Sequence, residues 1–216
     1  LGPSPEWGSW DVRTAVGRNP SFQLAAIHRL ARDLVAAARR LGVEPDPLWL
    51  DISRRLPRYA SDKTGIVLFE GSPFVRSHRH HSHMAGLFPF DVIDPDAEDC
   101  RTDVLNTYHT WVARGPGEWA GWSFPWASVL HTHIGDAMAA VWMLKTWDAF
   151  FCNEGHGSRH DAYHPGISTM RHGENARAYG KAGDAEGAEI MQMDGQCAAA
   201  AAVMELMVHE VNGRVR

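Results

Sequence analysis

Cysteine is scarce in this chain of 216 residues, which contains only Cys100, Cys152 and Cys197. These residues form no CxxC pair and cannot all pair internally, so the sequence favours neither a disulfide scaffold nor a zinc knuckle. No apolar run approaches the roughly 18 consecutive residues of a membrane span. Excess positive charge is also absent, since the formal net charge is −5. A broad field that would attract nucleic acid is therefore not expected.

The beginning of the sequence lacks both an initiator Met and a signal-peptide pattern. We therefore expect the chain to be a piece of a longer protein. Its length and its 44% hydrophobic and 22% charged residues suit one globular domain with a core of its own.

Tryptophan and histidine are abundant, with nine and thirteen copies. Sugar rings present flat apolar faces that stack on indoles, so a tryptophan-rich, mildly acidic domain hints at carbohydrate binding. The same tryptophans can equally build a core. Composition alone leaves both interpretations open.

Helical periodicity dominates the chain, and no alternation of strands and helices is visible. The first helix should have Ser21 as its N-cap and stop at Gly42. Only Ile66–Phe69 reads as a strand, and residues 153–188 read as a long irregular segment that covers or lines a site. We expect an all-α fold of about seven helices, covering residues 21–41, 47–56, part of the histidine stretch as far as Pro89, 96–114, 121–133, 136–151 and 197–211.

The stretch "SHRHHSHMAGLFP" holds four histidines and an arginine. His78 and His81 are spaced by three residues, as are His80 and His83, whereas two histidines that bind one metal from a helix normally lie four apart. Arg79 would also oppose a cation. A polar pocket is therefore favoured over a metal site or a solvated surface. On a helix, His80 and His83 would share a face and His81 would point elsewhere.

A second histidine cluster has a spacing of four residues, at His156, His160 and His164. On a helix this spacing would align three imidazoles, but the neighbouring glycines and Pro165 oppose a helix there. A loop is the favoured interpretation, and a metal site is the alternative.

The stretch "GWSFPW" places Trp122 and Trp126 four residues apart at a helix start. Core packing and a sugar-stacking platform are equally supported for this pair.

Two carboxylates are candidates for chemistry. Asp194 lies in "MQMDGQ" at the start of the last helix, where the helix dipole stabilises an ionised acid, or where the residue simply caps the helix. Glu6 lies in "PSPEWGSW", where Trp7 can shield it from water. A shielded carboxyl has a raised pKa and can act as a general acid.

Taken in order, "SPEWG", "HRHHSHMAGLFP", "GWSFPW" and "MQMDGQ" resemble glycoside hydrolase family 95. Members of that family are inverting α-L-fucosidases and α-L-galactosidases built on an (α/α)6 barrel. Residues 78–89 match the family pattern throughout, and residues 121–126 and 192–195 match two further blocks. The resemblance implies that residues 1–216 form a single, partial catalytic domain, an (α/α)6 toroid or a large part of one, with 153–188 as an irregular insertion.

The same resemblance implies roles for individual residues. Glu6 corresponds to the general acid, and Asp194 to a base-side carboxylate that polarises an asparagine, which in turn activates the attacking water. No Asn-x-Asn occurs in this chain, so that asparagine is expected in an upstream half of the same barrel. The implied substrate-binding residues are Arg79, His80, His83, Trp122 and Gln192.

The implied function is exo-hydrolysis of terminal α-L-fucosides or α-L-galactosides in a glycan, with inversion. Neither a cofactor nor a metal is implied, nor a nucleic-acid or membrane partner, and secretion or a periplasmic location follows from the family alone. The alternatives are another (α/α)6 carbohydrate-active enzyme (a phosphorylase or a lyase), a histidine-rich metal-binding module, and a sugar-binding relative without catalysis.

Overall fold

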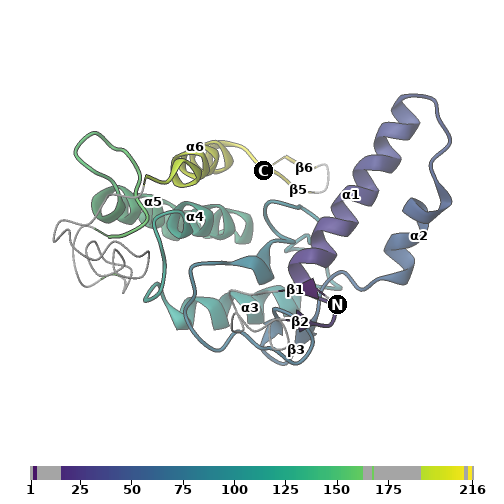
Figure 1. The fold of residues 1–216 in the computed structure, drawn as a ribbon, viewed down its shortest axis with the longest axis horizontal. Coiled ribbons are helices and arrows are strands. Elements are labelled where there is room, and N and C mark those ends of the chain that lie inside the picture. The colour runs from purple at the N-terminus through teal and green to yellow at the C-terminus, as the bar shows by residue number, and fades with distance from the viewer. Residues whose placement is uncertain (1, 4–15, 163–166, 168–190, 212–213, 216) are drawn as a thin grey trace. The chain divides into compact units, whose positions relative to one another are not determined.

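The computed structural model describes residues 2–3, 16–162, 167, 191–211 and 214–215 (Figure 1). Within these residues, six α-helices and one 3-10 turn are joined by loops and by three ribbons of two short antiparallel strands. The predominance of helix confirms the all-α prediction. In the same ranges, no helix is both long enough and apolar enough to cross a membrane.

The chain divides into two compact units, and each is described by itself. Unit 1 comprises Leu1–Val75 and Ser82–Ala113, and unit 2 comprises Arg76–His81 and Arg114–Arg216. The prediction of one catalytic domain over the whole chain stays a prediction.

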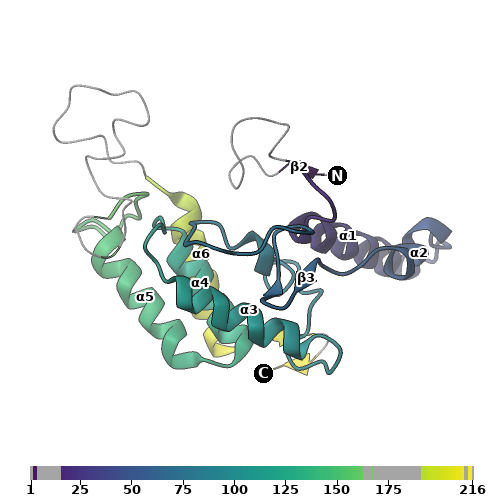
Figure 2. The same ribbon diagram turned by 90° about the horizontal axis from the view of Figure 1, so that it is seen from below.

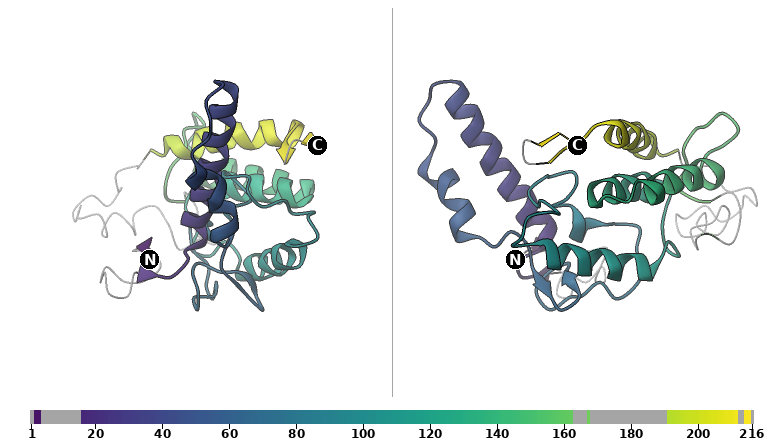
Figure 3. Two further views of the ribbon diagram at one scale, coloured as in Figure 1. Left: turned by 90° about the vertical axis from the view of Figure 1, so that its right-hand side faces the viewer. Right: turned by 180° about the vertical axis from the view of Figure 1, so that it is seen from behind.

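Unit 1 contains a helical hairpin of α1 (Ser21–Arg40) and α2 (Pro47–Arg55), seen in the right-hand view of Figure 3. Gly42 follows α1 with φ +69°, a left-handed conformation that glycine adopts without strain. Asp46 then caps α2, because its carboxylate accepts a hydrogen bond from Leu48 N at 2.8 Å. Both ends of the hairpin connection therefore follow local sequence signals.

The rest of unit 1 packs around α3 (Arg101–Arg114) and the turn η1 (Ser82–Met84). Its short strands are β1 (Gly2–Pro3) paired with β2 (Val16–Gly17), and β3 (Ser61–Asp62) paired with β4 (Gly65–Ile66). The fully buried core residues of this unit include Ile66, Val67, Met84, Leu87, Val104 and Trp111.

Unit 2 is built on α4 (Ser123–Ile134), which packs against both α5 (Ala137–Phe151) and α6 (Met193–Met207) (Figures 1 and 2). The helix α4 is almost entirely buried, and Phe124 in its first turn contacts Phe151 of α5 with 4.9 Å between ring centroids. Gly135, with φ +94°, separates α4 from α5 as predicted. Strands β5 (Glu210–Val211) and β6 (Arg214–Val215) form the third ribbon.

Several helix boundaries differ from the predictions. The N-cap of α1 is Pro20, not Ser21, because the buried Ser21 hydroxyl donates to Val67 O at 2.6 Å and accepts from Ala60 N at 3.0 Å. Helix α3 begins at Arg101, five residues later than expected, because Asp94 accepts a hydrogen bond from Asp96 N and forms a turn there. Helix α6 starts and ends four residues earlier than expected.

The helix predicted for the histidine stretch was wrong. Only the 3-10 turn Ser82–Met84 forms, and residues 78–81 are irregular. The reason is visible at His80, whose backbone N–H donates to the side-chain Nδ1 of His78 at 3.1 Å instead of to a carbonyl one helical turn away. Local side-chain hydrogen bonds of this kind compete with helix formation.

The strand predicted at Ile66–Phe69 is shorter than expected, since only Ile66 belongs to β4. Val67 N donates to Ala60 O at 2.9 Å and Leu68 N donates to Ser72 O at 3.2 Å. These backbone bonds belong to loop connections, so the apolar run is buried without a longer ladder.

Candidate active site

Three motifs that are far apart in the sequence meet around Trp122 in unit 2. The backbone N–H of Trp122 donates to the side-chain Oε1 of Gln192 at 3.0 Å, across 70 residues of sequence. The imidazole of His80 lies against the Trp122 indole with 4.7 Å between ring centroids. The indole of Trp126 stacks on that of Trp122 with 5.8 Å between centroids. The structure therefore brings His80, Trp122 and Gln192 into one cluster.

Gln192 holds this cluster through its backbone as well. Its N–H donates to Ser158 O at 3.0 Å, and the Ser158 hydroxyl donates back to Gln192 O. Because the Gln192 side chain is buried and its oxygen accepts from Trp122, the geometry favours a bracing role over direct sugar contact. Ser158 and its neighbour Arg159 were missed from the sequence, since they lie in a segment without periodicity.

Gly121 makes the approach of these segments possible. A Cβ at this position would lie 1.9 Å from Arg159 O and 3.0 Å from Gln192 Oε1, distances that only glycine avoids. Gly195 is similarly close to Ser158, whose Oγ would lie 2.8 Å from an added Cβ. Two glycines thus allow the start of α4, the start of α6 and the segment at Ser158 to pack together.

Substitution of Gly121 by Ala is therefore expected to lower the free energy of unfolding by about 1–3 kcal/mol or more, because a backbone carbonyl must move. Gly117→Ala is the matched control, since nothing lies within 4 Å of a Cβ added there. Urea denaturation measures both variants. Equal midpoints for Gly121→Ala and the native protein would contradict this packing.

His80 is held as a neutral imidazole. Burial lowers the pKa of His80 to about 3, and the neighbouring positive charges of His78, Arg79 and His160 lower it further in the same direction. A neutral imidazole offers one donor and one acceptor nitrogen. It can therefore exchange hydrogen bonds with hydroxyl groups over the ordinary pH range.

The lowered pKa has a consequence for stability. The unfolded chain binds a proton at His80 near pH 6.5, whereas the folded chain does so near pH 3. Protonation therefore favours the unfolded chain, and the free energy of unfolding decreases as the pH falls from 6.5 toward 3. We expect His80→Asn to reduce the dependence of the unfolding free energy on pH from 6.5 downward. Urea denaturation at several pH values measures it, and an unchanged dependence would contradict the assignment. Burial also lowers the pKa of His131 to about 4, so the unfolding free energy of His80→Asn should still depend on pH to a smaller extent.

Arg79 and His81 anchor the histidine stretch to α4. The Ser123 hydroxyl donates to the backbone carbonyl of Arg79 at 2.7 Å, and a ring nitrogen of His81 lies 3.0 Å from Ser123 O. The His81 imidazole is fully buried, with its ring 4.7 Å from Trp119 and 5.3 Å from Trp126. A nitrogen that bonds a carbonyl must carry the proton, so His81 donates here and braces α4.

The remaining predicted site residues lie as follows. Asp194 is exposed in the first turn of α6, where its Oδ1 accepts from Gly195 N at 2.9 Å. Gln192, not Asp194, occupies the N-cap position of α6. His83 belongs to unit 1, where it is buried and stacks on Phe74 at 4.3 Å. Glu6 lies outside the described residues.

The second histidine cluster is a loop in its described part, as the glycines indicated. His156 contacts the carboxylate of Asp148 at 2.9 Å, and His160 contacts that of Asp161 at 2.6 Å. His164 lies outside the described residues. Across the described ranges, no three His, Cys, Asp or Glu side chains are grouped so that they could hold a metal ion.

The cluster of indole and imidazole rings at Trp122, Trp126 and His80 offers an apolar aromatic surface with polar edges. The chain matches the model of the glycosyl hydrolase family 95 catalytic domain over residues 3–207, and it therefore belongs to this family. The resemblance seen in the sequence is confirmed, and with it the fold class, an (α/α)6 toroid or a large part of one. A search of curated proteins found no match. The family makes the protein a glycoside hydrolase with a glycan substrate.

Proposed function

We propose that the protein removes terminal α-L-fucosyl or α-L-galactosyl residues from glycans with inversion of configuration. The observation that carries the proposal is the cluster around Trp122, to which three motifs of the family resemblance contribute. It supplies an indole wall, a neutral imidazole and a nearby helix start that bears a carboxylate.

Inversion requires an acid on one side of the sugar and an activated water on the other, with about 6.5–9.5 Å between the two carboxyl groups. We assign the acid role to Glu6, flanked by prolines and Trp7 in the sequence. Asp194 takes the base side, acting through an asparagine. Its position in the first turn of α6 supports this role, because negative charge is favourable at a helix N-terminus.

The sugar is held, in this proposal, by Trp122, His80 and Arg79 of unit 2, and the sugar contact predicted for His83 of unit 1 stays a prediction. The indole of Trp122 offers an apolar face to the ring and to the methyl group of a 6-deoxy sugar. The neutral imidazole of His80 bonds hydroxyls without attracting a counter-ion. Gln192 contributes by fixing the backbone of Trp122.

The test is an assay of the intact protein on α-L-fucosylated and α-L-galactosylated oligosaccharides. We expect the free sugar to be released without added phosphate and without an unsaturated product that absorbs in the near ultraviolet. Strict phosphate dependence would indicate a phosphorylase, and an absorbing product would indicate a lyase. Fucose binding without turnover would indicate a relative that has lost catalysis. Stoichiometric bound zinc, nickel or copper in chelator-free protein would support the metal-binding alternative.

A further inference from the structure

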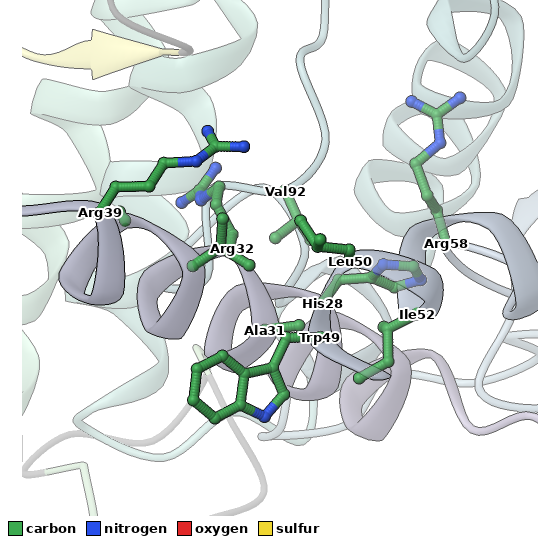
Figure 4. Close-up of a pocket in the computed structure, with 11 residues that line it drawn as sticks. His28, Ala31, Arg32, Arg39, Trp49, Leu50, Ile52, Arg58 and Val92 are labelled. Carbon is green, nitrogen blue, oxygen red and sulfur yellow. The ribbon is translucent and has the colours of Figure 1, made fainter. Parts of the chain in front are cut away.

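Unit 1 contains a pocket of about 500 Å³ between the helices α1 and α2, and none of the motif residues described above lines it (Figure 4). Its size is in the range of small-molecule sites. The apolar part of its wall consists of Ala31 and Val35 from α1, Trp49, Leu50 and Ile52 from α2, and Val92. Trp49 is half-buried and Leu50 is exposed, so this wall is accessible in unit 1.

The charged part of the wall is cationic. Arg32, Arg39 and Arg58 line the pocket, and no Asp or Glu is among its lining residues. Arg58 is neutralised by an ion pair with Asp99. The Arg32 guanidinium donates to a neutral group, the backbone carbonyl of Asp91, at 2.7 Å. The carboxylate of Asp33 lies farther from it, at 3.8 Å. The pocket therefore keeps excess positive charge.

Arg32 and Arg39 concentrate this charge at one end of the pocket. They are seven residues apart on α1, which is about two helical turns and places both on one face. Figure 4 shows their guanidinium groups toward the same end, with His28 and Arg58 toward the other. The Arg39 guanidinium makes no ion pair or hydrogen bond with the part of the chain that the structure describes.

His28 adds a hydrogen-bond acceptor. Its Nε2 lies 3.0 Å from Pro57 O and therefore carries the proton, because a carbonyl can only accept. In the neutral ring, Nδ1 is then an acceptor that a hydroxyl can donate to. The pocket thus combines two guanidinium groups for an anion, one acceptor for a hydroxyl, and an apolar wall with an indole.

We propose that this pocket binds a uronic-acid residue of an acidic glycan. A sugar carboxylate matches the planar donors of Arg32 and Arg39, a ring hydroxyl donates to His28 Nδ1, and the apolar face of the ring lies against the wall at Trp49 and Val92. The protein would then hold an acidic part of its glycan through residues other than Glu6 and Asp194.

Arg39 has a simpler explanation, since a cation in the last turn of a helix is favourable to the helix dipole. Arg40 serves that purpose equally and does not line the pocket. Arg40→Gln is therefore the matched control for Arg39→Gln, because both substitutions remove one charge from the same helical turn.

The test is calorimetric titration of the intact protein with digalacturonic acid, with galactobiose as its neutral counterpart and hexanoate as a carboxylate without a sugar ring. We expect digalacturonic acid to bind at least roughly tenfold more tightly than either. Arg39→Gln should weaken this binding by roughly ten- to a hundredfold, and Arg40→Gln should leave it unchanged. Added salt should weaken it in the native protein.

Three results would overturn the proposal: no binding of digalacturonic acid, equal binding of hexanoate, or equal effects of the two arginine variants. Circular dichroism checks that Arg39→Gln is folded, which is expected because the Arg39 guanidinium has no partner in the described part of the chain. Hydrolysis of neutral fucosides by Arg39→Gln should equal that of the native protein. Failure of this proposal would therefore leave the proposed function untouched.

Discussion

Replacement of Glu6 by Gln is expected to reduce the turnover of natural fucosylated oligosaccharides by about 10²–10⁴-fold. The amide cannot give a proton to the departing glycosidic oxygen, and general acid catalysis contributes this much to such reactions. An activated substrate such as a 4-nitrophenyl fucoside needs no protonation of its leaving group. Its hydrolysis should therefore fall far less, and steady-state kinetics on both substrates measures the difference.

Glu44→Gln is the control for this experiment, since Glu44 is an exposed glutamate in the loop between α1 and α2. It should hydrolyse both substrates at the native rate. Native activity of Glu6→Gln on the oligosaccharide would remove Glu6 from the acid role.

Asp194→Asn is expected to reduce kcat by about 10²–10⁴-fold on both kinds of substrate. The attacking water must be activated whatever the leaving group is, so this defect differs from that of Glu6→Gln. KM should change little, because Asp194 is not assigned a contact with the sugar. The amide keeps the size of the side chain, and its exposed position on α6 tolerates the change.

Glu154→Gln is the control in the same unit, since Glu154 is exposed and its substitution also removes one negative charge. A native kcat for Asp194→Asn would contradict the base-side assignment. A rise in KM at unchanged kcat would indicate that Asp194 binds the sugar instead.

Helix ends marked by strong local signals were predictable. Gly42 and Gly135 adopt the left-handed conformation that ends a helix, and Asp46 and Pro47 start α2 as a cap and first residue do. These signals depend on the backbone preferences of single residues, and such preferences do not require distant contacts. The histidine stretch carries no such signal, and its side chains bind nearby backbone groups instead of allowing a helix.

The candidate site was predictable in its residue types but not in its contacts. The motif around Trp122 and the motif around Gln192 were both identified, whereas the hydrogen bond between them spans 70 residues. Ser158 was missed for the same reason, because only its partner Gln192 gives it a role. A side chain that pairs with distant backbone has no periodicity to reveal it.

The N-terminus of α6 illustrates this limit. Asp194 was considered as a cap, but Gln192 holds that position and makes no capping hydrogen bond, since its side chain accepts from Trp122 instead. Asp194 is left in the first turn and exposed. A distant contact thus decides which of two neighbouring polar residues remains available for chemistry.

The most direct test of the proposed reaction is proton NMR of the sugar as it is first released from an α-L-fucoside. Because the proposed mechanism inverts the anomeric carbon, β-L-fucose should appear first, and the α-anomer should follow only by mutarotation. Initial appearance of α-L-fucose would contradict the mechanism assigned to Glu6 and Asp194.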